Sequence, residues 1–173
     1  SKIEPELGVY NDEALNHYSD VIDELLKNNI EPVITLHHFS HPIWFDKLGA
    51  FEKEKNISHL VSFSEKVFSH FSDRVKYWCT INEPGVVAIQ GYFTGMFPPG
   101  ETNGQKAGEV YKNLLESHVQ IYKCLKKNPN GNIVKIGIVK NINQFDPWNR
   151  YNIFDWLFTF AMNHIFNWAP INF

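Results

Sequence analysis

The sequence predicts an α/β fold built on a parallel sheet, and two observations support this prediction. Short β-branched apolar runs alternate with longer stretches of helical periodicity along the whole 173-residue chain. No connection between two expected strands is as short as a hairpin turn, and parallel neighbours need a crossover of about a dozen residues or more, usually a helix. These features leave two architectures open, a doubly wound open sheet and a (β/α)8 barrel.

The expected elements alternate, and each has a local reason. The first helix opens with Asp12 and Glu13, which suit the positive end of the helix dipole. The first strand is a continuous apolar run, typical of a strand buried on both faces. The last helix is apolar around much of its circumference, so we expect it to form part of the core. In chain order we expect a helix over 12–27, a strand over 32–36, a helix over 57–71, a strand over 75–81, a helix over 107–125, a strand over 133–139 and a helix over 151–166.

The two longest connections, over 37–56 and 84–104, are expected to be loops. Both follow the carboxyl ends of strands, where barrel enzymes build their active sites. No glycine-rich phosphate loop follows any strand, which counts against a nucleotide-binding open sheet. We therefore favour the barrel, and because a complete barrel needs about 250 residues, this chain would hold about three βα units.

Composition excludes several classes of protein. The chain has 16 Lys and Arg against 19 Asp and Glu, a formal charge of −3, so it lacks the basic surface that nucleic-acid binding requires. No apolar run approaches the length of about 18 residues that would suggest a membrane span. The two cysteines, Cys79 and Cys124, fit two reduced thiols better than a disulfide framework. We expect a cytoplasmic protein with no nucleic-acid or membrane partner.

The strongest local signal for chemistry is the segment TINEP, which ends the expected strand over 75–81 and places Asn82 and Glu83 directly after it. A carboxylate at the mouth of a parallel barrel can act as a general acid when burial or a second carboxylate raises its pKa. The neighbouring amide of Asn82 can donate a hydrogen bond to a sugar hydroxyl. The alternative is structural, with Glu83 turning the strand end and Asn82 bonding to the local backbone.

A second signal is a cluster of imidazoles and aromatic rings after the strand over 32–36, in the segment HHFSHPIWF. An imidazole can bind a hydroxyl, and an aromatic face packs well against the apolar face of a sugar ring. A metal site formed by His37, His38 and His41 is the competing interpretation. The spacing matches no zinc motif, so we expect no metal here. For His37 and His41 we favour a structural role.

Five segments in this order resemble the family 1 glycoside hydrolases, which include β-glucosidases, β-galactosidases and 6-phospho-β-glycosidases. The segments are SKIEP at 1–5, TLHHFSHPIWF at 35–45, RVKYWCTINEP at 74–84, the loop over 91–100, and KIGI at 135–138. The resemblance implies a partial (β/α)8 TIM barrel of about three βα units, preceded by the end of another strand. We therefore expect residues 1–173 to be one incomplete barrel domain, truncated at both ends.

The resemblance also implies roles for four residues. Glu83 matches the general acid/base, Asn82 the amide that binds the substrate 2-hydroxyl, and His38 the imidazole that binds a hydroxyl of the sugar in the first subsite. Phe39 stands where the family most often has Trp, so the indole N–H that would bind the sugar is missing. The resemblance requires no metal and no organic cofactor.

The implied activity is that of a retaining β-glycosidase acting on small-molecule β-glycosides or oligosaccharides. This mechanism uses an acid/base and a nucleophile, two carboxylates about 5–5.5 Å apart. In the family pattern the nucleophile follows the last segment matched here, so this chain would supply only the acid/base half, be inactive alone and need the rest of the barrel. Two alternatives remain: another barrel glycosidase family, and an inactive fragment or sugar-binding relative without hydrolysis.

Overall fold

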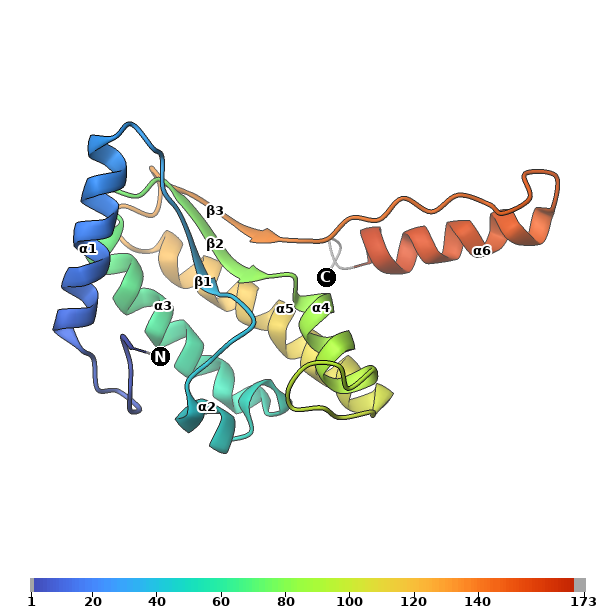
Figure 1. Cartoon of the computed structure of the whole chain (residues 1–173), viewed down its shortest axis with the longest axis horizontal. Coiled ribbons are helices and arrows are strands. Elements are labelled where there is room, and N and C mark those ends of the chain that lie inside the picture. The colour runs from blue at the N-terminus through green and yellow to red at the C-terminus, as the bar shows by residue number, and fades with distance from the viewer. Residues whose placement is uncertain (1, 170–173) are drawn as a thin grey trace. The chain divides into compact units, whose positions relative to one another are not determined.

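The computed structural model describes residues 2–169, and the chain divides into two compact units, Ser1–Val139 and Lys140–Phe173. In the first unit three parallel strands lie side by side in the order β1-β2-β3, with long helices running alongside them (Figure 1). The strands are β1 (Val33–His37), β2 (Tyr77–Asn82) and β3 (Lys135–Val139). Every connection between neighbouring strands contains a helix, which confirms the predicted parallel α/β architecture. The prediction of a single domain stays a prediction.

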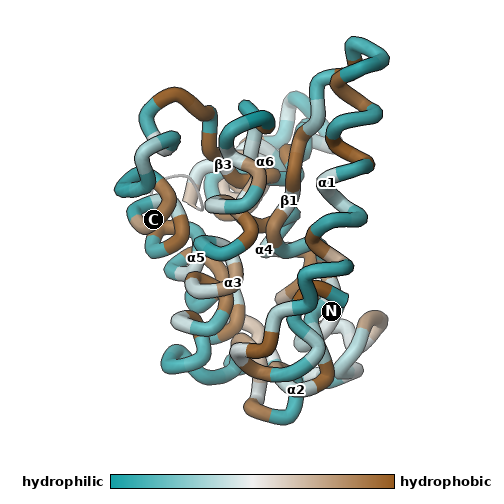
Figure 2. Tube along the Cα trace, turned by 90° about the vertical axis from the view of Figure 1, so that its left-hand side faces the viewer, coloured by the Kyte–Doolittle hydropathy of each residue, from teal (hydrophilic) through white to brown (hydrophobic). Residues whose placement is uncertain are grey.

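The three long helices of the first unit are α1 (Asp12–Lys27), α3 (Ile57–Phe71) and α5 (Gly104–Lys126). The side chain of Asn11 caps α1 by accepting hydrogen bonds from two backbone amides, and Asn103 caps α5 in the same way with one. Such caps satisfy donors that a helix leaves free in its first turn. Polar and apolar segments alternate along α1 in Figure 2, as expected for a helix with one face toward a core.

The core of the first unit lies between the sheet and the helices. Trp78 of β2 packs against Phe68 of α3 with 4.7 Å between ring centroids, and its indole N–H donates to the Val75 carbonyl at 3.0 Å. Burying a large apolar side chain stabilises a fold by roughly 1.5–3 kcal/mol, so this set of side chains fixes the sheet against the helices. Other fully buried members are Leu15, Phe71, Ile81, Val110, Leu114, Ile121 and Leu125.

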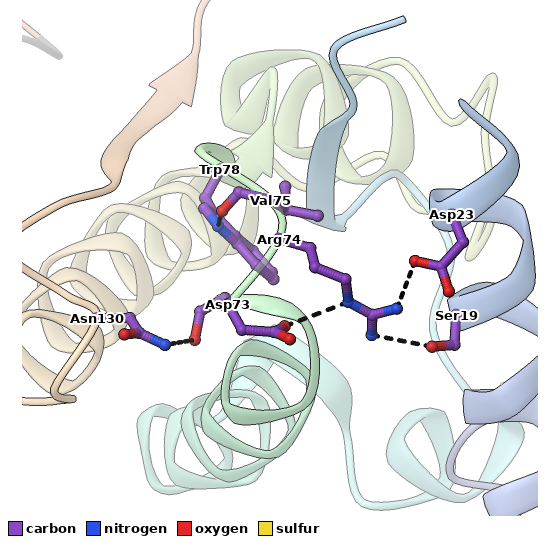
Figure 3. Close-up of polar contacts among 8 residues, drawn as sticks. Ser19, Asp23, Asp73, Arg74, Val75, Trp78 and Asn130 are labelled. Atoms are coloured by element: carbon purple, nitrogen blue, oxygen red, sulfur yellow. Dashed lines mark hydrogen bonds and ion pairs between the residues drawn. The ribbon is translucent and has the colours of Figure 1, made fainter. Parts of the chain in front are cut away.

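Polar contacts gather at the amino end of β2, and Figure 3 shows how they converge. The guanidinium of Arg74 donates to Asp23 at 2.6 Å and to Ser19 at 2.9 Å, both on α1, and its Nε lies 3.4 Å from Asp73. The hydrogen bond with Asp23 is the main reason that the pKa of Arg74 is raised. This end of the sheet is thereby tied to α1.

The two long connections are helical in part, so the prediction that they are loops was wrong. The first contains α2 (Ile43–Lys47) and two 3-10 turns (Ala50–Glu52 and Glu54–Asn56). The second contains α4 (Pro84–Ala88) and a π-helical turn, η3 (Ile89–Phe93). Proline fits the first position of a helix because its missing N–H would be unbonded there anyway. Pro84 therefore starts a helix after β2 instead of only ending the strand.

The amino-terminal segment departs from the prediction as well. Residues 2–5 form no strand, and Ser1 lies outside the described residues. A strand of so few residues gains few ladder hydrogen bonds, and here the backbone instead makes a bridge between Glu6 and Val9 and a bond from the Asn11 amide to the Ile3 carbonyl. The three-stranded sheet begins at β1.

The second unit consists of an extended segment followed by α6 (Ile153–Asn163) and a π-helical turn, η4 (His164–Trp168). Asn167 joins its two parts, since its side-chain amide donates to the Asn143 carbonyl and to Asn163. None of the α6 residues is buried, so the prediction that this helix forms part of a core was wrong for the described residues. Among residues 2–169, no helix combines the length and apolar character needed to span a bilayer.

Candidate active site

The carboxyl ends of β1 and β2 bring the predicted site residues to one edge of the sheet. His37 is paired in register with Ile81, and Asn82 with Val139. Because the strands are parallel, His38, which follows β1, and Glu83, which follows β2, both lie just beyond this same edge. The structure thus places His38, from the first sequence segment, and Asn82 and Glu83, from the second, at the carboxyl ends of neighbouring strands.

Glu83 has an unusual backbone. Its φ and ψ angles are 42° and 65°, in the left-handed region, and its amide donates to the Val139 carbonyl of β3 at 2.8 Å. A non-glycine residue in this region costs roughly 1–2 kcal/mol, and such strain is concentrated at active sites and ligand-binding sites. The bond to β3 and the immediate start of α4 at Pro84 hold Glu83 in this conformation.

Phe39 is the counterpart of Glu83 at the end of β1. It too has a left-handed backbone, with φ of 65°, and its ring lies 5.1 Å from the His38 ring. Its ring also lies 6.3 Å from that of Phe97, which comes from the connection after β2. The two strand ends are therefore followed by strained residues, and the two connections contact each other through aromatic rings.

The polar side chains at this edge are not used to hold the fold. Glu83 is half-buried, and His38 is exposed. Within residues 2–169 the side chains of Asn82, Glu83 and His38 make no hydrogen bond or ion pair with another residue. This disfavours the structural alternative for Asn82 and Glu83, in which local backbone groups would satisfy them, and leaves the side chains available to a ligand.

His37 and His41 are packed among aromatic rings instead. The His37 ring stacks on His41 with 6.2 Å between centroids and meets the edge of Phe51 at 5.0 Å. Burial lowers the pKa of His37 to about 3 and also lowers the pKa of His41, so His37 is neutral at physiological pH. This packing fits the structural role predicted for both. Among the described residues no three His, Cys, Asp or Glu side chains are grouped so that they could hold a metal ion.

A cavity of about 530 Å³ lies along β1, between α1 and α3. His37 and His38 line it, but Asn82 and Glu83 do not. It follows the side of β1 that pairs with no strand in the described part of the chain. The cavity therefore lies beside β1, the outermost strand, and is distinct from the strand ends where Glu83 lies.

The sequence did not identify two further residues that contact the connections after β1 and β2, namely Phe97 and Lys106. Phe97 lies in the loop over 91–100, which resembles the family as a segment but gives no role to this residue. Lys106 lies in the first turn of α5, and helical spacing alone predicts no role for it. Lys106 forms ion pairs with Glu52 and Glu101, residues 54 and 5 positions away in sequence. Only the charge of the three residues was visible in the sequence, and charge does not reveal which residues will pair.

Parallel strands joined by helices, with polar side chains gathered at the carboxyl ends of β1 and β2, are the arrangement of a segment of a (β/α)8 barrel. The family model of glycosyl hydrolase family 1 matches residues 1–159, and the chain belongs to this family.

Individual relatives agree with this assignment. The 6-phospho-β-galactosidase of Clostridium acetobutylicum is 39% identical over 78% of this chain and 28% of its own, and the human cytosolic β-glucosidase is 38% identical over 65% and 24%. Among solved structures, the β-glycosidase from Pyrococcus horikoshii superposes with a TM-score of 0.90 at 36% identity, covering 99% of this chain and 39% of that one. The chain thus spans about a quarter to two fifths of the length of these relatives.

Proposed function

We propose that the chain carries the acid/base part of a retaining β-glycosidase. In this reaction Glu83 protonates the glycosidic oxygen as the bond to the sugar breaks, and later removes a proton from the water that releases the sugar. The observation that supports this role best is the position of Glu83, half-buried beyond the carboxyl end of β2, with a strained backbone and no partner for its side chain among residues 2–169.

Three neighbours would bind the sugar. Asn82 would donate its amide N–H to the 2-hydroxyl, and the imidazole of His38 would bind another hydroxyl of the same ring. The exposed face of Phe39 would pack against the sugar, without the additional hydrogen bond that a Trp could donate. The substrates would be small β-glycosides or oligosaccharides, and the two free thiols, Cys79 and Cys124, are consistent with a cytoplasmic location.

The nucleophile would come from outside these 173 residues. A glycosyl-enzyme intermediate needs a second carboxylate about 5–5.5 Å from the acid/base. The family resemblance puts that carboxylate beyond the segments matched here, and this chain covers 39% of the solved relative. Residues 1–173 alone should therefore show no turnover of an activated aryl β-glycoside.

The test uses a chimeric barrel in which residues 1–173 replace the matching segment of the Pyrococcus horikoshii β-glycosidase. The chimeric barrel should hydrolyse aryl β-glycosides. Glu83→Ala should stall at the glycosyl-enzyme, because no base activates water, and added azide should restore turnover and give a β-glycosyl azide, since azide needs no deprotonation. Glu54→Gln, an exposed carboxylate of the same chain, is the matched control and should behave like the unsubstituted barrel.

The alternative is a relative that binds sugar without hydrolysing it. A chimeric barrel that binds a glycoside but neither turns it over nor responds to azide would support that alternative and contradict the assignment of Glu83.

A further inference from the structure

Lys106 joins the two connections that border the candidate active site. Its ammonium lies 3.1 Å from the Glu52 carboxylate and 2.7 Å from that of Glu101. Glu52 ends the 3-10 turn in the connection after β1, whereas Glu101 belongs to the connection after β2. The side chains of the three residues are each about one-third exposed, at 30%, 29% and 34%, so water only partly screens their attraction.

Other contacts hold the same two parts in place, one to α5 and one to η3. The Asn113 side chain of α5 donates to the Phe51 carbonyl at 2.8 Å, next to Glu52. On the other side, the Glu101 amide donates to the Gly91 carbonyl at 3.0 Å, which attaches this part of the chain to η3. Lys106 is the residue through which both connections are held by one charged group at the start of α5.

The two connections meet at Phe39 and Phe97, one ring from each. Both residues are partly exposed, at 37% and 42%, and their rings meet edge to face with 6.3 Å between centroids. An aromatic pair contributes only about 0.5–1.5 kcal/mol beyond the area it buries. Fixing the backbone of even one residue costs about 1–2 kcal/mol, so this contact alone would not keep two long connections in register.

We infer that Lys106 is a positioning residue for the reaction assigned to this site. By pairing with Glu52 and Glu101 it holds the Phe39–Phe97 pair together as an apolar wall for the substrate. The inference rests on the proposed function only for its kinetic consequence, because the contact itself can be tested without turnover. The acid/base residue is held separately, through the bond from Glu83 to β3, so loss of Lys106 should weaken substrate binding and leave the chemical step intact.

The kinetic test compares variants of the chimeric barrel with an aryl β-glycoside. Lys106→Met should raise KM about fivefold, with kcat within about twofold. Lys106→Arg should restore KM, because a guanidinium can bind both carboxylates. Lys112→Met removes an exposed charge from the same helix that makes no ion pair among the described residues, and it should change neither constant.

A double-mutant cycle tests whether Lys106 acts through the ring pair. If it does, Lys106→Met added to Phe97→Ala should raise KM no further than Phe97→Ala alone, whereas independent effects would multiply. Salt gives a second check. At about 1 M salt the screening length falls to about 3 Å, so KM should rise for the unsubstituted barrel and stay constant for Lys106→Met.

Limited chymotrypsin digestion tests the Phe39–Phe97 contact without depending on glycoside turnover. Cleavage after Phe39, the ring of the pair whose next residue is not proline, is measured by mass spectrometry against cleavage elsewhere in the chain. It should increase in Lys106→Met and return to the original level in Lys106→Arg. Unchanged cleavage, or a fall in kcat with KM unchanged, would overturn the positioning role. An inactive barrel in which cleavage after Phe39 still responds to Lys106 would contradict the proposed function and leave this inference standing.

Discussion

The three-stranded sheet has an amino edge, where its strands begin, and a carboxyl edge, where they end. These two edges use polar residues in opposite ways. At the amino edge, the Arg74 guanidinium has three partners, Ser19, Asp23 and Asp73, and Asn130 is bonded to Ser72 (Figure 3). At the carboxyl edge, the side chains of Asn82 and Glu83 have no partner among residues 2–169, and Glu83 has a left-handed backbone. The polar groups at the amino edge stabilise the fold, whereas Asn82 and Glu83 at the carboxyl edge stay unpaired, and the backbone of Glu83 lowers the stability. Barrel enzymes divide their two faces in this way.

The largest expected effect lies at the carboxyl edge. In the chimeric barrel, Glu83→Gln should slow hydrolysis of glycosides with poor leaving groups by about 10²–10⁴-fold, the usual contribution of a general acid. Glycosides whose leaving group departs as a stable anion need no protonation and should lose far less in the step that releases it. The melting temperature should stay the same, because the Glu83 side chain contacts no partner. Equal rate losses across a series of leaving groups would argue against an acid role.

His37, at the carboxyl end of β1, differs from Glu83 because it is buried. Its two ring nitrogens also have no hydrogen-bond partner in the described part of the chain. Burial holds its pKa at about 3, whereas in the unfolded chain it would be near its ordinary value of 6.5. The unfolded state therefore binds the extra proton first, and stability should fall as the pH drops from about 6.5 toward about 3.

Replacing His37 by Phe, which has a similar shape and takes up no proton, should remove this acid-dependent loss. At pH 4 the difference should be roughly 3 kcal/mol in the free energy of unfolding, and near neutral pH it should be small. Urea denaturation of the chimeric barrel from pH 4 to 7 provides the measurement. The exposed His17, changed to Gln, serves as the control; parallel pH curves for His37→Phe and the unsubstituted barrel would count against the neutral buried imidazole.

At the amino edge, Arg74→Met should reduce the free energy of unfolding by about 1–3 kcal/mol, because hydrogen bonds to charged groups contribute about that much. Its kcat per folded molecule should not change. Lys76→Met is the matched control, since Lys76 pairs with Glu31 while both side chains are well exposed, and such surface pairs contribute little. A loss of activity in Arg74→Met without a loss of stability would contradict the assignment of a purely stabilising role to the amino edge.

The smallest effect concerns the missing indole. Phe39→Trp should lower KM for a β-glycoside up to about tenfold, because one added hydrogen bond contributes about 0.5–1.5 kcal/mol. The backbone strain at this position is unchanged by the substitution, so the melting temperature should stay the same. Phe93→Trp, at an exposed aromatic position outside the strand ends, is the control and should leave KM unaltered.

Local patterns in the sequence were sufficient to predict the parallel sheet, because apolar periodicity and helical crossovers determine it. They also located His38, Asn82 and Glu83 at strand ends. They missed α4 because a proline after a strand was interpreted only as a stop. The left-handed angle of Glu83 has no local signature, since it depends on a hydrogen bond to Val139. Periodicity identified the apolar surface of α6 but could not determine whether anything covers it within its own unit.

The left-handed backbone of Glu83 also has an evolutionary consequence. Glycine adopts φ near 42° without steric cost, so Glu83→Gly should relieve strain of roughly 1–2 kcal/mol while removing the carboxylate. A laboratory selection for thermal resistance alone would therefore favour a substitution that removes the proposed acid/base group. A lineage freed from the need to hydrolyse sugars would be expected to drift toward glycine at this position.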